Sequence, residues 1–255
     1  MLAGRIVERD YAIVRKVWLH GWIISSLLMP VLFLAAMGVG LGGVIDEHQR
    51  SVGGVSYLHF VAPGLLVASV MQQAAGDSMW PVLGGVKWDR RYLAMVATPL
   101  GPDDVQRALL SWVAIRNAVS AVGFLLVASL MGGVASPWAV LAVPAAVLCG
   151  AAFTALLSGL AIRQENDTTL SLVYRLGIMP VFLFSGSFFP ISVLPAWLRP
   201  VAWASPLWHG VELARHACTA DPHWGADTLH LVVLIAIVLA ASAWARTGFR
   251  RRLTP

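Results

Sequence analysis

The sequence predicts an all-α integral membrane protein with six transmembrane helices, an N-terminal interfacial helix, a short cytoplasmic helix and re-entrant outer helices between spans five and six. Of its 255 residues, 58% are hydrophobic and only 12% are charged, whereas soluble globular domains average about 25% charged residues. The surplus apolar surface must therefore face lipid. Several charge-free runs are also long enough to cross a bilayer, which takes about 20 residues of helix.

The six spans follow from the charge-free runs, with His taken as neutral. The runs are Val17–Ile45, Ser51–Gly76, Asn117–Ile162, Leu176–Leu198 and Thr228–Ala245. The third run is long enough for two helices, because turn residues at 132–137 divide it. The chain is thus expected to be one transmembrane domain, 1–255, with spans at about 20–42, 56–76, 111–131, 138–161, 169–189 and 228–246.

Basic residues predict the orientation, because Lys and Arg near span ends are retained on the cytoplasmic side. Thirteen of the eighteen Lys and Arg residues fall before span one, between spans two and three, between spans four and five, or after span six. Both termini are therefore predicted in the cytoplasm. We assign the net charge of +5 to the anionic cytoplasmic leaflet, so membrane lipids are the expected partner and nucleic acid is not. Asp77, Arg116 and Arg163 lie near span ends, where we expect them to reach water.

The first residues, from Arg5 to Trp18, alternate charged and apolar side chains in a helical pattern. A helix of this kind lies along the membrane surface before the chain turns inward. A plain anchor that sets the orientation is the alternative, because basic residues and Trp are common before any first span. The apolar run that follows is too long for a signal-peptide core, so we expect it to remain as a span.

The loop between spans two and three contains a short amphipathic helix, predicted at 88–97. Its polar side carries Asp89 and Arg90, and Leu93, Val96 and Ala97 share one apolar face. The prolines at 99 and 102 end it. A short helix on a cytoplasmic loop can dock into a groove of a soluble partner. A solvated loop with one interfacial turn is the alternative.

The outer segment, 186–227, is apolar but contains four prolines between 190 and 206, so it cannot be one straight span. Ser205 is placed to cap a helix that begins at Pro206 and runs to about His216. Tryptophans here are expected at the outer interface. The segment therefore predicts re-entrant outer helices, whose marker residues are Trp197, Trp203, Trp208, His209 and Glu212.

Sequence motifs for ATP hydrolysis and for common hydrolases are absent. There is no G-x-x-x-x-G-K-[ST] phosphate loop, no G-x-S-x-G elbow and no H-E-x-x-H helix. Four histidines recur every seven residues from His209 to His230, but Pro222 and Gly225 interrupt the helix between them, so no metal site is predicted. Glu212 is expected to pair with Arg215 or with the histidine at 216. No disulfide and no catalytic residue is predicted.

Two stretches carry a resemblance to a known family. The first is Trp88-Asp89 through Thr98-Pro99-Leu100, and the second is Phe184-Ser-Gly-Ser-Phe-Phe-Pro190 followed by Leu194-Pro195 and Trp203-Ala-Ser-Pro-Leu207. Over nearly its whole length the chain resembles the ABC-2 type exporter permeases, and within them the branch similar to nodulation-type lipo-oligosaccharide exporters and daunorubicin-type resistance permeases.

The resemblance implies a partner and a mechanism. Two copies of an ABC-type ATPase subunit would bind ATP and Mg, so no cofactor is expected in this chain, and a second permease copy, giving a homodimer, would complete the exporter in the bacterial plasma membrane. The short helix would be the coupling helix, and spans one, two and five would move to pass an amphipathic substrate outward. The residues implied in coupling to the ATPase are Trp88, Asp89, Arg90, Arg91, Tyr92, Leu93, Val96, Thr98, Arg5 and Arg9.

The path of the substrate is expected to use aromatic side chains near the end of span five. They are Phe182, Phe184, Phe188 and Phe189, for which packing in the protein core is the alternative. A different class of function stays open: a membrane-embedded enzyme that uses Glu212 and His209 on a lipid-linked substrate at the outer interface. A purely structural membrane scaffold is the third possibility.

Overall fold

The computed structural model describes residues 2–17, 28, 31–41, 55–219 and 223–254. Within these ranges the chain is helical, and five helical stretches are long and apolar enough to cross a membrane: Tyr57–Lys87, Pro102–Leu130, Pro137–Ala161, Asp167–Phe184 and Trp224–Leu253. Eleven of the 23 residues of the predicted first span, 20–42, lie outside the described residues. Its described part includes a π-helical segment, η1 (Ala35–Leu41).

Helix α4 (Tyr57–Ser78), continued by α5 (Trp80–Lys87), is the central element of the bundle. It packs against three other helices, α7, α8 and α12. In its most apolar stretch 72% of the residues are buried, against 11% in Asp167–Phe184. Apolar residues therefore occur on all sides of α4, as expected for a helix surrounded by protein.

Helices α7 (Pro102–Leu130) and α8 (Ala142–Ala161) form an antiparallel pair joined by a turn and the short η2 (Pro137–Leu141). Small residues allow α8 to approach its neighbours closely. A Cβ added to Gly159 of α8, for example, would lie 2.7 Å from the ring of Trp244 in α13 (Trp224–Leu253). The close contacts of α8 with α4, α7 and α13 make it the second structural centre of the bundle.

The fifth predicted span consists of α9 (Asp167–Val173), the π-helical η3 (Tyr174–Ile178) and α10 (Met179–Phe184). Its helix ends at Phe184, five residues before the predicted boundary at 189. The chain turns there because Gly186 has φ +81, a conformation that favours glycine.

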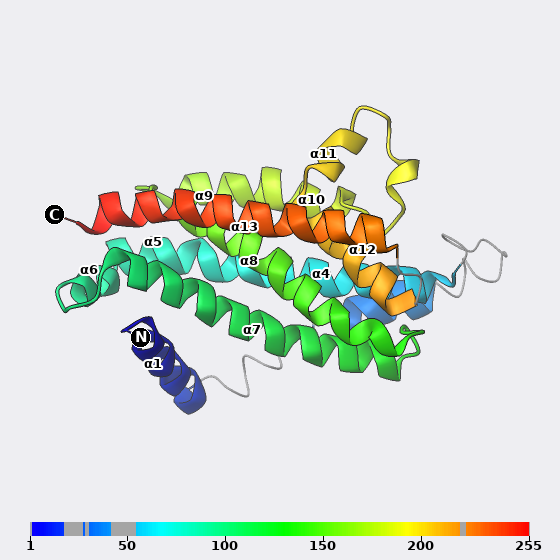
Figure 1. The fold of residues 1–255 in the computed structure, drawn as a ribbon, viewed down its shortest axis with the longest axis horizontal. Coiled ribbons are helices and arrows are strands. Elements are labelled where there is room, and N and C mark those ends of the chain that lie inside the picture. The colour runs from blue at the N-terminus through cyan, green and yellow to red at the C-terminus, as the bar shows by residue number, and fades with distance from the viewer. Residues whose placement is uncertain (1, 18–27, 29–30, 42–54, 220–222, 255) are drawn as a thin grey trace.

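The two ends of the bundle differ in what they carry. One end holds α1 (Leu2–Val17), α6 (Arg91–Val96) and the C-terminal turns of α13 (Figure 1). At the other end lie η4 (Ile191–Val193), α11 (Arg199–Trp203) and the C-terminal end of α12 (Pro206–Thr219). Both described terminal helices thus reach the same end of the bundle as the short helix predicted in the loop after span two.

Candidate functional site

The short helix α6 is held firmly on the end of α5. The backbone N–H of Trp88 donates to the Gly84 carbonyl at 3.0 Å. Arg90 then adopts the left-handed conformation, with φ 52, and reverses the chain direction. Because of this turn the helix begins at Arg91, three residues after the predicted start. The guanidinium of Arg91 donates back to the Pro81 carbonyl at 2.7 Å and so fixes α6 beside α5.

The inner face of α6 is buried in the bundle. Tyr92 and Met95 are only 5% and 7% exposed. The Tyr92 ring lies 6.2 Å from that of Phe249 in α13, and burial raises the pKa of the Tyr92 phenol. Thr98 closes the helix by donating its hydroxyl to the Met95 carbonyl at 2.6 Å. Displacement of α6 would therefore disturb α5 and α13 together.

The outer face of α6 carries the predicted apolar residues. Leu93, Val96 and Ala97 line a groove with a volume of about 390 Å³, which Leu253 of α13 closes from one side. Trp88 is 62% exposed at the edge of the helix, and Asp89 and Arg90 are exposed as well. The structure thus presents an apolar groove and an exposed indole at the end of the bundle that carries the termini.

Ion pairs connect α5 and α13 with the loop between α8 and α9 at the end of the bundle that carries the termini. Lys87 of α5 and Arg252 of α13 both pair with Glu165, which lies in the loop between α8 and α9. Hydrogen bonding by Arg252 is the main cause that lowers the pKa of the Glu165 carboxyl. Arg163, which we expected to be solvated, lies 4.2 Å from the Trp244 ring centroid and donates to the Trp244 carbonyl at 2.7 Å. A long cationic side chain can cover an aromatic ring in this way at a span end.

A partly buried ion pair joins α4 and α7. The guanidinium of Arg116 donates to the Asp77 carboxylate at 2.9 Å, and the side chains are 21% and 17% exposed. The expectation that these residues reach water at span ends was wrong, because each has a partner of opposite charge inside the protein. Asp77 and Arg116 are 39 residues apart, so the sequence gave no signal that they pair. An Asp at the edge of an apolar run does indicate a group that needs a partner.

Helix α1 packs against α7. Ile6 is its buried apolar contact. Arg5, one of the predicted coupling residues, is exposed. Arg9, another, pairs with Asp10 at 2.6 Å and lines a cavity shared with α6 and α7. The structure therefore brings Arg9 together with Arg91 and Tyr92, which are also predicted coupling residues, and it leaves Arg5 outside the cavity.

At the opposite end, the segment after α10 is pressed against α4. A Cβ added to Gly64 would lie 2.5 Å from the Ser187 carbonyl oxygen, so the two backbones touch. The hydroxyl of Tyr57 donates to the Phe188 carbonyl at 3.3 Å. Arg215 of α12 donates to the Gly186 carbonyl at 2.7 Å and to the Glu212 carboxylate at 2.6 Å. The expected pairing of Glu212 with Arg215 is present, but it is not a surface pair, since the side chains are only 22% and 12% exposed.

The four phenylalanines expected on the substrate path lie near one another. The Phe182 and Phe188 rings are 5.1 Å apart, and the Phe184 and Phe189 rings are 6.4 Å apart. Phe188 is buried, whereas Phe184 is 39% exposed. The cluster thus includes both packed and accessible rings at the C-terminal end of the fifth span.

Helix α12 begins at Pro206, as the sequence predicted. Ser205 accepts a hydrogen bond from the Leu207 N–H at 3.2 Å and so caps α12, which continues to Thr219, slightly beyond the expected end. Pro195 starts a turn, not a helix: the Leu198 N–H donates to its carbonyl at 2.9 Å. Trp197 and Trp203 are exposed, whereas the Trp208 ring packs against two buried histidines.

The four outer histidines form two separate pairs. His209 and His230 are buried, with their Nδ1 atoms 2.7 Å apart. The rings of His216 and His223 are 4.8 Å apart. Among the described residues no group of three or more His, Cys, Asp or Glu side chains is arranged to hold a metal ion. The seven-residue repeat of these histidines did not predict the first pair, because the helix is interrupted between His209 and His230 and the contact depends on how α12 and α13 pack.

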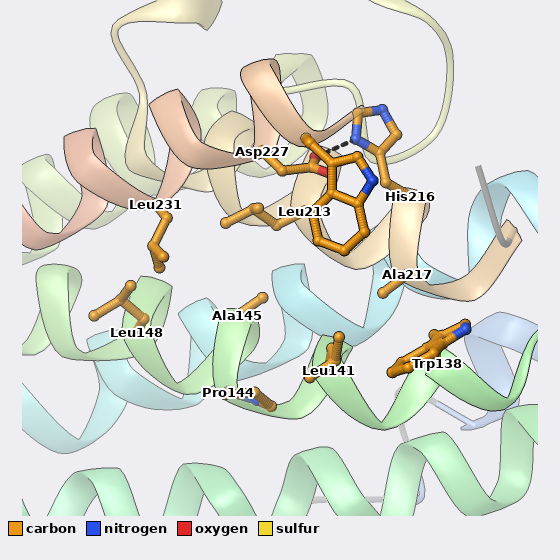
Figure 2. A pocket seen from close by; sticks show the side chains of 11 residues that line it. Trp138, Leu141, Pro144, Ala145, Leu148, Leu213, His216, Ala217, Asp227 and Leu231 are labelled. Carbon is orange, nitrogen blue, oxygen red and sulfur yellow. Dashed lines mark hydrogen bonds and ion pairs between the residues drawn. The ribbon is translucent and has the colours of Figure 1, made fainter. Parts of the chain in front are cut away.

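A groove with a volume of about 630 Å³ lies between α8, α12 and α13 (Figure 2). Its walls are almost entirely apolar, with Leu141, Ala145 and Leu148 contributed by α8 and its N-terminal turn. One end is polar, since His216 Nδ1 lies 2.5 Å from the Asp227 carboxylate. The groove therefore offers a long apolar surface with one polar end.

Comparison with known proteins assigns the family. The ABC-2 type transporter family matches residues 10–218. The chain is 28% identical to Nodulation protein J of Rhizobium leguminosarum bv. viciae over 248 residues, which cover 96% of this chain and 93% of that protein. It is 26% identical to Nodulation protein J of Rhizobium meliloti (strain 1021) over 250 residues, 97% of this chain and 92% of that protein. The chain, a multi-pass membrane permease, therefore belongs to the ABC-2 type transporter family.

Proposed function

We propose that this chain is the permease subunit of an ATP-binding-cassette exporter that moves an amphipathic substrate, such as a glycolipid, lipo-oligosaccharide or hydrophobic drug, outward across the plasma membrane. The observation that carries the proposal is the mounting of α6. Its inner face is buried against the bundle, and its outer face lines an apolar groove at the end that holds both termini. A separate ATPase subunit, present in two copies and binding ATP and Mg, docks there and drives transport.

The route of coupling follows from the contacts of α6. Force on Leu93 and Val96 passes to Tyr92, and from there to α13 through Phe249. It also passes to α5 through the hydrogen bond from Arg91 to the Pro81 carbonyl. Because α5 continues α4, movement of α6 reaches the central helix of the bundle. This is the link that an ATP-driven change of access requires.

A second permease copy completes the proposed exporter as a homodimer. The stretch Asp167–Phe184 is the least buried of the five candidate spans, with 11% of the residues in its most apolar window buried. Leu172, Leu176 and Leu183 are all exposed along it. Such a surface suits a helix that faces a partner subunit and the substrate path between the two copies.

Two features fit an amphipathic cargo. The groove of Figure 2 joins apolar walls to the polar pair of His216 and Asp227. The phenylalanine cluster that includes Phe184 offers accessible rings at the same, outer end of the bundle. Outer-facing apolar sites of this kind support a substrate that carries a hydrocarbon or fused-ring portion.

The decisive experiment uses the permease reconstituted with an ABC-type ATPase as the candidate partner. Complex assembly and ATP turnover are compared for the native chain and for Leu93→Asp/Val96→Asp. The buried inner face of α6 is untouched by these changes, so we expect the fold to persist while assembly or permease-stimulated turnover is lost. The matched control is Val193→Asp/Val201→Asp, which places the same charges on exposed positions at the opposite end.

Unchanged assembly and turnover in Leu93→Asp/Val96→Asp would contradict the coupling assignment and favour a structural scaffold. The enzyme alternative is not favoured by the geometry. His209 is buried against His230, and Glu212 is paired with Arg215, so each side chain that would act as a general base already has another partner.

A further inference from the structure

A second cavity lies at the end of the bundle that holds both termini. It has a volume of about 390 Å³ and is enclosed by α1, α4, α5, α6 and α7. Its apolar side is formed by Ile6, Leu109 and Trp112. Five charged side chains complete it: Arg9, Asp10, Asp77, Arg91 and Arg116. Charged residues are scarce in this protein, so their concentration around one cavity indicates a ligand-binding site.

The charges around this cavity do not balance. Arg9 pairs with Asp10 at 2.6 Å and Arg116 with Asp77 at 2.9 Å. Arg91 makes no ion pair with any residue that the structure describes, and it donates only to neutral oxygens. One positive charge is therefore left over, and a buried or half-buried guanidinium is stabilised by an anion.

Nε of Arg91, a donor, and Oδ2 of Asp77, an acceptor, are buried and lack a hydrogen-bond partner within the described chain. Leaving such atoms unpaired costs free energy, so a ligand that accepts from the first and donates to the second would be favoured. A phosphate supplies acceptor oxygens, and a hydroxyl group supplies the donor.

We propose that this cavity binds the phosphate group of an anionic lipid, with the glycerol hydroxyls of phosphatidylglycerol as the headgroup chemistry that fits best. Arginines bind phosphate oxygens with charge-assisted hydrogen bonds, so Arg91 and Arg9 hold the phosphate. Asp77 accepts from a headgroup hydroxyl. The apolar side, with Ile6 and Trp112, receives the start of the acyl chains. In the proposed orientation the cavity faces the anionic cytoplasmic leaflet.

This assignment depends on neither the cargo nor the ATPase. The bound ligand would contact Arg9 of α1 and Arg91 of α6. It would therefore hold α1 against α6 and against α7, which lines the same cavity. Phosphate chemistry is shared by a lipid headgroup and by free phosphate, and the choice of probes separates the two sources.

The test uses the purified full-length permease in a neutral detergent, without the ATPase. Thermal melting is followed while phosphatidylglycerol, phosphatidylcholine or inorganic phosphate is added. We expect phosphatidylglycerol to raise the melting temperature, and phosphatidylcholine and inorganic phosphate to have little effect. In Arg9→Gln/Arg91→Gln the apparent affinity for phosphatidylglycerol should fall by about tenfold or more.

The matched control removes the same charge from neighbouring residues that do not line the cavity. It is Arg5→Gln/Arg90→Asn, with Asn chosen because it tolerates the left-handed backbone at 90. This variant should bind phosphatidylglycerol like the native chain. Arg9→Gln alone serves as a second test, because it leaves every contact of α6 with α5 in place.

Equal weakening in the two double variants would overturn the proposal, since it would mean that overall charge alone attracts the lipid. Equal stabilisation by phosphatidylglycerol and phosphatidylcholine would overturn it as well. Stabilisation by inorganic phosphate that the cavity variant loses would support the phosphate site and overturn the lipid as its source.

Discussion

The guanidinium of Arg215 lies 4.0 Å from the centroid of the Phe60 ring. The contact joins α12 to α4. The same guanidinium donates to the Gly186 carbonyl at 2.7 Å, so one side chain fixes the chain where it leaves the fifth span. An arginine in this position combines the two interactions for which its planar group is suited: stacking on a ring and directed hydrogen bonding.

Replacing Arg215 by Gln should release the segment 185–189 from α4. The change removes the ring contact and the bond to Gly186, and it leaves Glu212 with only the longer contact to His216 at 3.8 Å, at a cost of about 3 kcal/mol. The measurement is maleimide labelling of Ser187→Cys, a position that is buried in the native chain. Labelling should be slow in the native background and fast with Arg215→Gln. Equal rates would show that the segment is held by other contacts.

Gly64→Ala tests the backbone contact between α4 and Ser187. The added methyl group would lie 2.5 Å from the Ser187 carbonyl oxygen, so the segment must move and the protein should lose about 1–3 kcal/mol of stability. Gly76→Ala, in the same helix, meets nothing within 4 Å and should stabilise α4 by up to about 1 kcal/mol. Thermal unfolding of both variants checks the prediction, and a loss of stability in both would refute it.

Gly85→Ala should displace α6 without adding any charge. A Cβ at this position would lie 2.7 Å from the Tyr92 ring and from Nε of Arg91. We expect permease-stimulated ATP turnover to fall several-fold while the bundle remains folded. Gly4→Ala on α1, where nothing lies within 4 Å, is the control at the same end. Normal turnover in Gly85→Ala would mean that the exact seat of α6 is unimportant for coupling.

Acidification should loosen the contacts of Glu165. The pKa of this carboxyl is lowered in the folded protein, mainly by hydrogen bonding from Arg252. Its contribution to stability is therefore present above the ordinary Glu value of about 4.3 and is lost as the pH falls through the lower, folded value. The native chain should lose slightly more thermal stability than Glu165→Gln between about pH 5 and pH 3. Identical pH profiles would count against the pairing, and added salt should reduce the difference.

The positions of the spans could largely be predicted from charge-free runs, but not their full lengths. Helix α7 starts at Pro102, about nine residues before the predicted span, and α13 ends at Leu253, beyond the predicted limit of 246. Hydropathy marks only the part of a helix that lies in hydrocarbon. Backbone hydrogen bonds extend α7 beyond its apolar run to include Asp103, and they extend α13 to include Arg250. The Arg250 guanidinium then donates to the Asp103 carboxylate at 2.8 Å.

Candidate site residues could be predicted where they lie close together in the sequence, but not where a site joins distant residues. The apolar face of α6 is a repeat within one turn, so Leu93 and Val96 were found. The pair of Asp77 and Arg116, the pair of His209 and His230, and the contact of Gly64 with Ser187 join residues distant in sequence. Such contacts depend on how helices pack, which a single sequence does not encode as a pattern.

The π-helical turn η3, Tyr174–Ile178, divides the fifth span into an N-terminal and a C-terminal half. Such a turn contains one residue more than an α-turn, and that extra residue can pass along the helix as hydrogen bonds exchange one at a time. Each step rotates the helix beyond it by about 100° and advances it by about 1.5 Å. The C-terminal half, with Phe182 and Phe184, can therefore make a screw motion relative to the N-terminal half while the backbone of the span stays hydrogen-bonded throughout.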